Sequence, residues 1–125
     1  MTLGKIIEAF DKERANSISL SMKIRWISAL DLKISSELLE IRGGEEFGGY
    51  DETCSLQIKV KAPEEYSEIY GLYLNMKLDY LNGEIGRFNN SAMLFNRCYA
   101  QMSDFVNRKK AVVKNPTIKA GKLYG

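Results

Sequence analysis

Apolar side chains recur at helical spacing through the first third of the chain. They step by three and four within residues 2–14, and they form one stripe with spacings of three, four and seven within residues 19–42. This spacing places apolar side chains on one face of an α-helix. The pattern therefore predicts a short helix and then a long one. Thr2 is the expected N-cap of the first helix and Ser17 or Ser19 that of the second, because their hydroxyls can accept backbone N–H groups.

Two more helices are predicted in the second half of the chain. The first begins at Pro63, which suits an initial helical turn, and carries two apolar faces. One face holds four tyrosines at positions 66, 70, 73 and 80, and the other holds leucines at 74, 78 and 81. The last helix should end near Lys109 or Lys110, where cations complement its dipole. Its predicted core stripe steps by three and four through Ile85, Phe88, Ala92, Phe95, Tyr99, Met102 and Val106.

The Asn82-Gly83 step between these two helices can be interpreted in several ways. A β-hairpin needs alternating strands on both sides, whereas the flanks step by three and four. The spacing of Gly83 and Gly86 is that of the nucleic-acid clamp in KH modules, but a single extended segment cannot supply the sheet on which such modules rest. Asn-Gly also suits a helix C-terminus. We therefore expect two helices, or one sharply kinked helix, at Gly83.

Residues 43–62 form the long irregular region of the chain. Gly43-Gly44 is expected to end the second helix, and a second glycine pair follows at 48–49. Apolar and polar residues then alternate, which predicts an extended segment over about residues 54–61, bounded by Pro63. No other segment of the chain offers it a partner strand. We expect it to lie against a helix or to pair with a neighbouring copy.

Charge divides the chain into two unequal parts. The 125 residues carry 18 cations and 16 acids, and six of the cations but none of the acids fall within residues 107–125. An acidic body with a basic tail suggests an interaction arm, although a solvated tail is equally consistent with it. No uncharged apolar window is long enough to predict a membrane span, and the start of the chain does not resemble a signal peptide.

Few residues suggest catalysis or metal binding. The chain has no histidine, the commonest general base and metal ligand, and Cys54 and Cys98 are too few for a metal cluster. Cys98 falls in an apolar helical pattern and is expected to be buried. Asp31 lies on the apolar stripe of the second helix; it is expected to pair with a cation at the edge of the stripe, or to be a buried acid. We expect no enzyme, no cofactor and no metal, and a helical enzyme would need an acid pocket around Asp31.

Two segments, IRWISALDLKISSEL and YLNMKLDYLNGEIGRFNNSAMLFNRCYAQM, carry a resemblance to a known family. In order and type, their motifs resemble those of the head–tail connector (adaptor) proteins of long-tailed phages and prophages. The resemblance covers about residues 2–108, and the Gly-rich loop and the basic tail depart from it. The matching positions are Arg25, Trp26, Ile27, Pro63, Tyr66, Asn82, Gly83, Glu84, Asn90, Phe95 and Asn96.

The resemblance implies a structural subunit that forms a ring under the portal and joins the head to the tail. It implies no active site. The implied partners are further copies of the chain, the portal, the tail-completion proteins and, non-specifically, DNA in the channel; neither a membrane nor a small-molecule substrate is implied. The implied location is the cytoplasm of the bacterial host during assembly and then the head–tail junction of the virion.

The expected fold is all-α: a small bundle of about four helices, with one long loop and a basic C-terminal tail. Residues 1–110 are expected to form the helical connector-like domain, and residues 111–125 an extended or disordered tail. The alternative function is a small nucleic-acid-binding or regulatory protein that uses this tail. The residues expected at a partner or oligomer interface are Phe47, Tyr50, Arg108, Lys109, Lys110 and Lys114.

Overall fold

Four α-helices form the fold in the part of the chain that the computed structural model describes, residues 1–39 and 47–114 without the side chains of 112–114. The all-α class predicted from the sequence is therefore confirmed. Two short helical turns, η1 and η2, adjoin α2 and α3. The elements are α1 (Leu3–Glu13), α2 (Leu20–Ile34), η1 (Ser35–Leu39), η2 (Glu64–Tyr66), α3 (Glu68–Leu81) and α4 (Ile85–Lys114).

Local sequence signals set the starts of the first two helices. The Oγ1 atom of Thr2 accepts a hydrogen bond from the Lys5 amide at 3.3 Å, and Ser19 Oγ accepts one from the Met22 amide at 3.2 Å. Of the two predicted caps for α2, the structure therefore selects Ser19. After Ile34, α2 passes directly into the π-helical turn η1, a change of helix type that the sequence did not predict. The predicted stop at Gly43-Gly44 lies outside the described residues.

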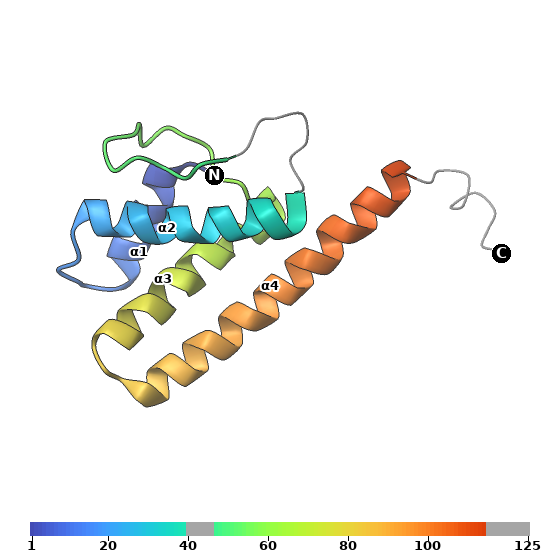
Figure 1. Ribbon diagram of the computed structural model, residues 1–125. Helices are drawn as coiled ribbons and strands as arrows, with labels where there is room; N and C mark the ends of the chain where they lie inside the picture. The colour runs from blue at the N-terminus through green and yellow to red at the C-terminus, as the bar shows by residue number, and fades with distance from the viewer. Residues whose placement is uncertain (40–46, 115–125) are drawn as a thin grey trace.

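Helix α3 is the centre of the bundle. It packs against α1 and α2 on one side and most extensively against α4 on the other, where the two helices run antiparallel (Figure 1). Tyr70 and Leu74 of α3 are wholly buried, and Cys98 of α4 is buried as expected. The core is completed by apolar side chains from every helix: Leu3, Ile6, Ile7, Phe10, Ile24, Ile27, Leu30, Ile34, Leu38, Ala62, Ile69, Leu78, Phe95, Met102 and Val106.

The extended segment before α3 pairs with the start of the same chain. The Leu3 amide donates to the Ile58 carbonyl at 2.9 Å, and the Val60 amide donates to the Met1 carbonyl at 3.1 Å. Thr2 and Lys59 form an antiparallel bridge. The expectation that no partner exists within the chain was therefore wrong. Alternation identified the extended segment, but a partner of only a few residues before the first helix leaves no alternating pattern of its own.

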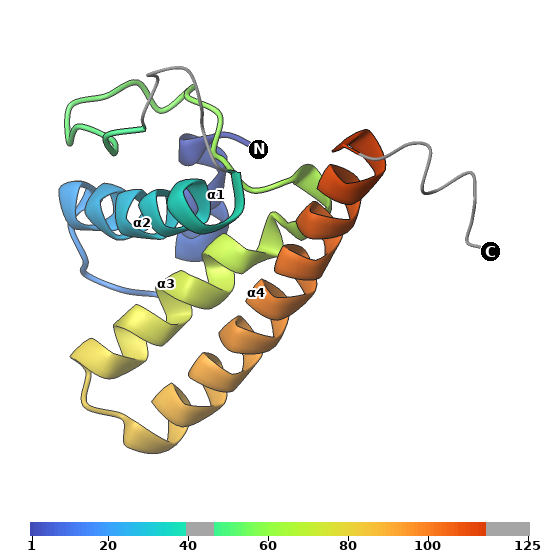
Figure 2. The same cartoon turned by 45° about the vertical axis from the view of Figure 1, so that its right-hand side comes forward.

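The break between α3 and α4 is at Asn82-Gly83, as predicted. The Asn82 amide closes the last turn of α3 on the Leu78 carbonyl at 2.9 Å, and Gly83 has a φ of 70°. A positive φ costs glycine little, because it has no Cβ. Helix α4 then continues to Lys114, about one turn beyond the end predicted near Lys109 or Lys110. Its C-terminal turns point away from α1 in both views (Figures 1 and 2).

Candidate interaction surfaces

Asp31 of α2 is wholly buried and receives hydrogen bonds from three donors of its own chain. Its Oδ1 atom accepts from the Tyr70 hydroxyl at 2.5 Å. Its Oδ2 atom accepts from the Tyr50 hydroxyl and from the Lys61 amide, the latter at 3.1 Å. Burial raises the pKa of Asp31, although each of these hydrogen bonds acts to lower it. Of its two expected states, the structure shows the buried acid, and tyrosine hydroxyls occupy the place where a cation was expected.

The same hydrogen bonds fasten the segment before α3 to the helices. Ser28, one turn before Asp31 on α2, accepts the Tyr50 amide at 2.9 Å. The Tyr70 hydroxyl accepts the Ala62 amide at 2.8 Å while it donates to Asp31. Asp31 is thus buried, as the hypothesis of a helical enzyme requires, but its oxygens are occupied by structural donors. This geometry is that of an anchor for residues 47–62.

A second polar cluster joins α1, α3 and α4. Asp79 is 1% exposed and accepts from the Arg14 guanidinium on one oxygen and from Ser91 Oγ, at 2.6 Å, on the other. Arg14 also donates to Asn75 Oδ1 at 3.2 Å. Desolvation alone would raise the pKa of Asp79, but the hydrogen bonds from Arg14 and Ser91 outweigh it, so its pKa lies below the ordinary value.

The corner between α3 and α4 exposes three large apolar side chains. Tyr80 is 72% exposed, Leu81 60% and Ile85 74%. We call these three residues the corner patch. The apolar spacing of the sequence put Leu81 on a helix expected to be central or at a subunit interface, and Ile85 at the start of the stripe of the last helix; the structure leaves both side chains exposed. Both lie where α3 ends and α4 begins, at the end of the hairpin farthest from η1 and η2 (Figure 2), and no other described element covers them.

The two aromatic residues predicted at an interface lie together beside the Asp31 anchor. The ring centroids of Phe47 and Tyr50 are 4.9 Å apart in an edge-on arrangement. The Lys61 ammonium lies over the Phe47 ring, 4.8 Å from its centroid. Both rings are half-buried, and the Tyr50 hydroxyl donates its hydrogen bond to Asp31.

The four cations predicted at an interface share the last turns of α4. Arg108 and Lys109 are exposed, and Lys110 is half-buried. Lys109 lies 4.0 Å from a Glu65 carboxylate oxygen and 4.4 Å from the centroid of the Phe105 ring. The helix includes Lys114, whose side chain is outside the described part, as are residues 115–125 of the predicted tail. The cations and the two aromatic residues thus belong to separate elements.

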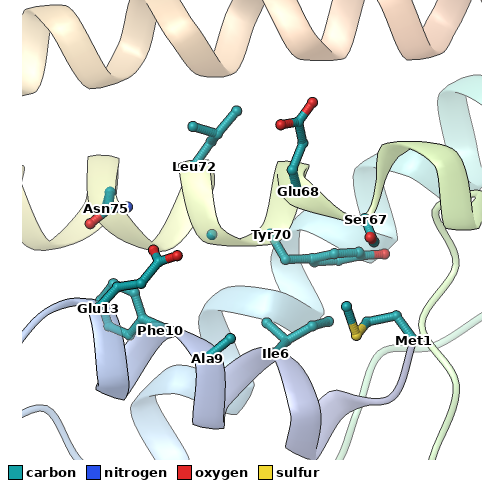
Figure 3. A pocket seen from close by; sticks show the side chains of 11 residues that line it. Met1, Ile6, Ala9, Phe10, Glu13, Ser67, Glu68, Tyr70, Leu72 and Asn75 are labelled. Carbon is teal, nitrogen blue, oxygen red and sulfur yellow. The ribbon is translucent and has the colours of Figure 1, made fainter.

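Two open hollows flank α3. One, of about 330 Å³, lies between α1 and α3 (Figure 3); we call it the α1–α3 groove. The other, of about 340 Å³, lies over the Arg14–Asp79–Ser91 cluster and is also lined by Arg87, Asn90 and Leu94. Sequence reasoning predicted neither hollow. Gly71, in the middle of α3, lines the α1–α3 groove. A glycine inside a helical pattern was the sequence signal that could have indicated a gap in the helix surface there.

No helix in the described ranges is both long and apolar enough to cross a bilayer. Comparison of the chain with models of protein families, with curated proteins and with solved structures gave no match in any of the three.

Proposed function

We propose that this chain is a structural subunit of the head–tail connector of a long-tailed phage or prophage. In this function it associates with further copies into a ring between the portal and the tail. The observation that carries the proposal is the corner patch of Tyr80, Leu81 and Ile85, which are all more than half exposed. Contiguous exposed apolar patches are a mark of protein–protein contact sites.

The corner is well built to hold such a contact. Beneath the patch, Asp79 binds Arg14 of α1 and Ser91 of α4, so the angle between α3 and α4 is fixed by buried polar contacts. The Tyr80 ring lies 5.6 Å from the Phe88 ring, which joins the patch to the first turns of α4. A rigid apolar surface loses little conformational entropy when it binds a partner.

The resemblance of residues 2–108 to connector proteins supplies the identity of the partners. They would be neighbouring subunits, the portal and tail-completion proteins, first in the cytoplasm of the host and then in the virion. A closed ring needs two different patches on each subunit, because its contacts are heterologous. Portal, protease and capsid genes directly upstream of the coding sequence would support the proposal, whereas a metabolic operon would contradict it.

We expect serine at both Leu81 and Ile85 to weaken docking onto portal-bearing heads by about tenfold or more. The two changes remove apolar area at the centre of the proposed contact, and each lost apolar anchor is worth about 1 kcal/mol or more. The measurement is co-sedimentation of the full chain with tailless, DNA-filled heads of the phage that encodes it. Leu20→Ser is the matched control, because Leu20 is 48% exposed at the first residue of α2 and is not part of the corner patch. Equal docking by the double variant and the control would refute the role of the corner patch.

The alternative function, nucleic-acid binding through the basic C-terminal segment, has one observation in its favour. Arg108 and Lys109 are exposed on turns of α4 that point away from α1 (Figure 1), and residues 107–125 hold six cations and no acid. Such a segment can neutralise phosphates without reading their sequence.

For a connector we expect no binding to free duplex DNA that depends on this segment. The intact chain and a chain lacking residues 108–125 should give the same fluorescence anisotropy with labelled DNA at 50 and 200 mM salt. Salt-sensitive binding by the intact chain, lost on deletion, would favour the alternative, because released counterions make phosphate contacts weaken steeply with salt. A chain with glutamine at Lys114, Lys119 and Lys122 tests the same charge effect with the full length retained.

A further inference from the structure

Two carboxylates line the α1–α3 groove without a cationic partner. Glu13 of α1 and Glu68 of α3 are both exposed, and no ion pair joins either of them to another described residue. Glu68 accepts only the Cys98 thiol, at a distance of 4.0 Å. No lysine or arginine is among the lining residues. The N-terminal ammonium of Met1, another lining residue, is paired with Glu64, so Glu13 and Glu68 leave the groove with a negative charge that favours a cationic occupant.

The floor of the groove is apolar, and in Figure 3 the Glu68 side chain lies at its rim, pointing from α3 toward α4. Ile6, Phe10 and Tyr70 form its deeper part, and Leu72 lies on the side of α4 (Figure 3). Gly71 of α3 also lines the groove, and a Cβ built on it meets no atom within 4 Å. The missing side chain at this position is what keeps the groove open. A volume of about 330 Å³ admits a few side chains of a peptide and is too small for a folded domain.

The chain itself contains a segment with matching chemistry. Residues 111–125, AVVKNPTIKAGKLYG, carry three lysines and no acid, and apolar residues stand beside them. A lysine can lay its aliphatic stem on an apolar floor and hold its ammonium group at a carboxylate. We propose that the α1–α3 groove binds residues 111–125 of a second copy of this chain.

A second copy fits better than the same copy. Helix α3 stands between α1 and α4, and the C-terminal end of α4 points away from α1 in both views (Figures 1 and 2). Groove and segment are different surfaces of one subunit, so their contact is head-to-tail and can close into a ring. The inference rests on the self-association that the proposed function assumes, and it assigns the two surfaces that meet.

A labelled peptide of residues 111–125 tests the site, with the full chain as titrant and fluorescence anisotropy as readout. We expect saturable binding that weakens with salt. Glutamine at both Glu13 and Glu68 should weaken it about tenfold, because two exposed charge pairs are lost. Gly71→Leu should abolish it by filling the groove, while the urea midpoint rises because leucine is the better helix former. Failure of the peptide to bind would overturn the proposal.

Matched changes outside the groove provide the controls. Glu8→Gln removes an exposed acid of α1, and Gly86→Leu adds the same side chain at a helical glycine whose surroundings are equally open. Both should bind the peptide like the wild-type chain. Groove variants that bind as well as these controls would contradict the assignment of the site, even if the peptide binds elsewhere on the chain.

Sedimentation velocity separates a second copy from the chain's own segment. The mean mass of the wild-type chain should rise with concentration, and this rise should be lost in Gly71→Leu and in a chain that ends at residue 110. A mass independent of concentration, with the peptide still binding, would mean docking within one molecule and would overturn the inference. If the groove fails both tests while Leu81 and Ile85 still govern docking to heads, the proposed function stands without it.

Discussion

Replacing Asp31 with alanine is expected to lower the free energy of unfolding by about 3 kcal/mol. The change leaves the Tyr70 hydroxyl and the Lys61 amide without their acceptor inside the fold, and each such buried donor costs about 1–3 kcal/mol. Tyr50 loses its acceptor as well but is half-buried, so water can compensate in part. The removal of a buried carboxylate offsets some of this loss. Urea denaturation followed by circular dichroism measures the change.

Milder substitutions distinguish a loss of the hydrogen bonds to Asp31 from a loss of packing around it. Asp31→Asn keeps the shape and one carbonyl oxygen, so it should cost less than alanine. Tyr50→Phe removes one donor of three and should cost about 1 kcal/mol. An unchanged urea midpoint in Asp31→Ala would show that the cluster does not hold residues 47–62 on α2.

The contribution of Asp31 to stability is expected to change with pH in one direction. Burial raises its pKa in the folded state above the unfolded value near 3.8, so the folded state binds the proton more tightly. Its contribution to stability is therefore greatest below the unfolded pKa and is lost as the pH rises through the folded pKa. The gap in unfolding free energy between the wild-type chain and Asp31→Asn should widen as the pH falls from neutral towards 4. A gap that narrows would contradict the raised pKa.

Replacing Asp79 with alanine is expected to cost about 2 kcal/mol. Asp79 accepts one charge-assisted hydrogen bond from Arg14, and such a bond is worth about 1.5–3 kcal/mol. Arg14 is only partly buried and keeps Asn75 and, at 3.7 Å, Glu84 as partners, which limits the loss. Thermal and urea unfolding measure the effect. Glu84→Gln is the control, because its side chain is 45% exposed and exposed ion pairs contribute little.

The lowered pKa of Asp79 makes stability change with pH in the direction opposite to that expected for Asp31. Because hydrogen bonds from Arg14 and Ser91 lower it, the contribution of Asp79 is present above its unfolded pKa and is lost as the pH falls through the folded value. The wild-type chain should therefore lose stability on acidification more steeply than Asp79→Asn. Parallel acid profiles for the two chains would show that the Arg14 contact does not stabilise the carboxylate.

The sequence located the helices well, because their signals are local. A hydroxyl at Thr2 or Ser19 caps whichever helix begins there, and apolar spacing of three and four identifies a helix before its partner is known. Gly83 marked the corner, since glycine adopts a positive φ at little cost. The candidate interface was harder to predict, because the exposure of a side chain depends on which other elements of the fold pack over it.

The same periodicity does not tell how far along a helix its apolar stripe is covered by a partner within the chain. Leu81 and Ile85 extend the apolar rows of α3 and α4 to the ends of these helices, and spacing alone does not distinguish a core position from an interface position. In the structure no other described helix reaches that far, so both side chains are exposed. A periodic pattern gives the face of a helix but not the length over which that face is covered.

Sequence by itself determined the order of the helices, their first turns, the corner at Asn82-Gly83 and the gathering of cations after residue 107. Each depends on neighbours a few positions away, through capping, spacing or charge. Only the tertiary structure decided that Asp31 anchors residues 47–62, that the first residues pair with the extended segment, and that a groove opens above Gly71. These features join residues far apart in the chain, and long-range packing sets their burial and their hydrogen-bond partners.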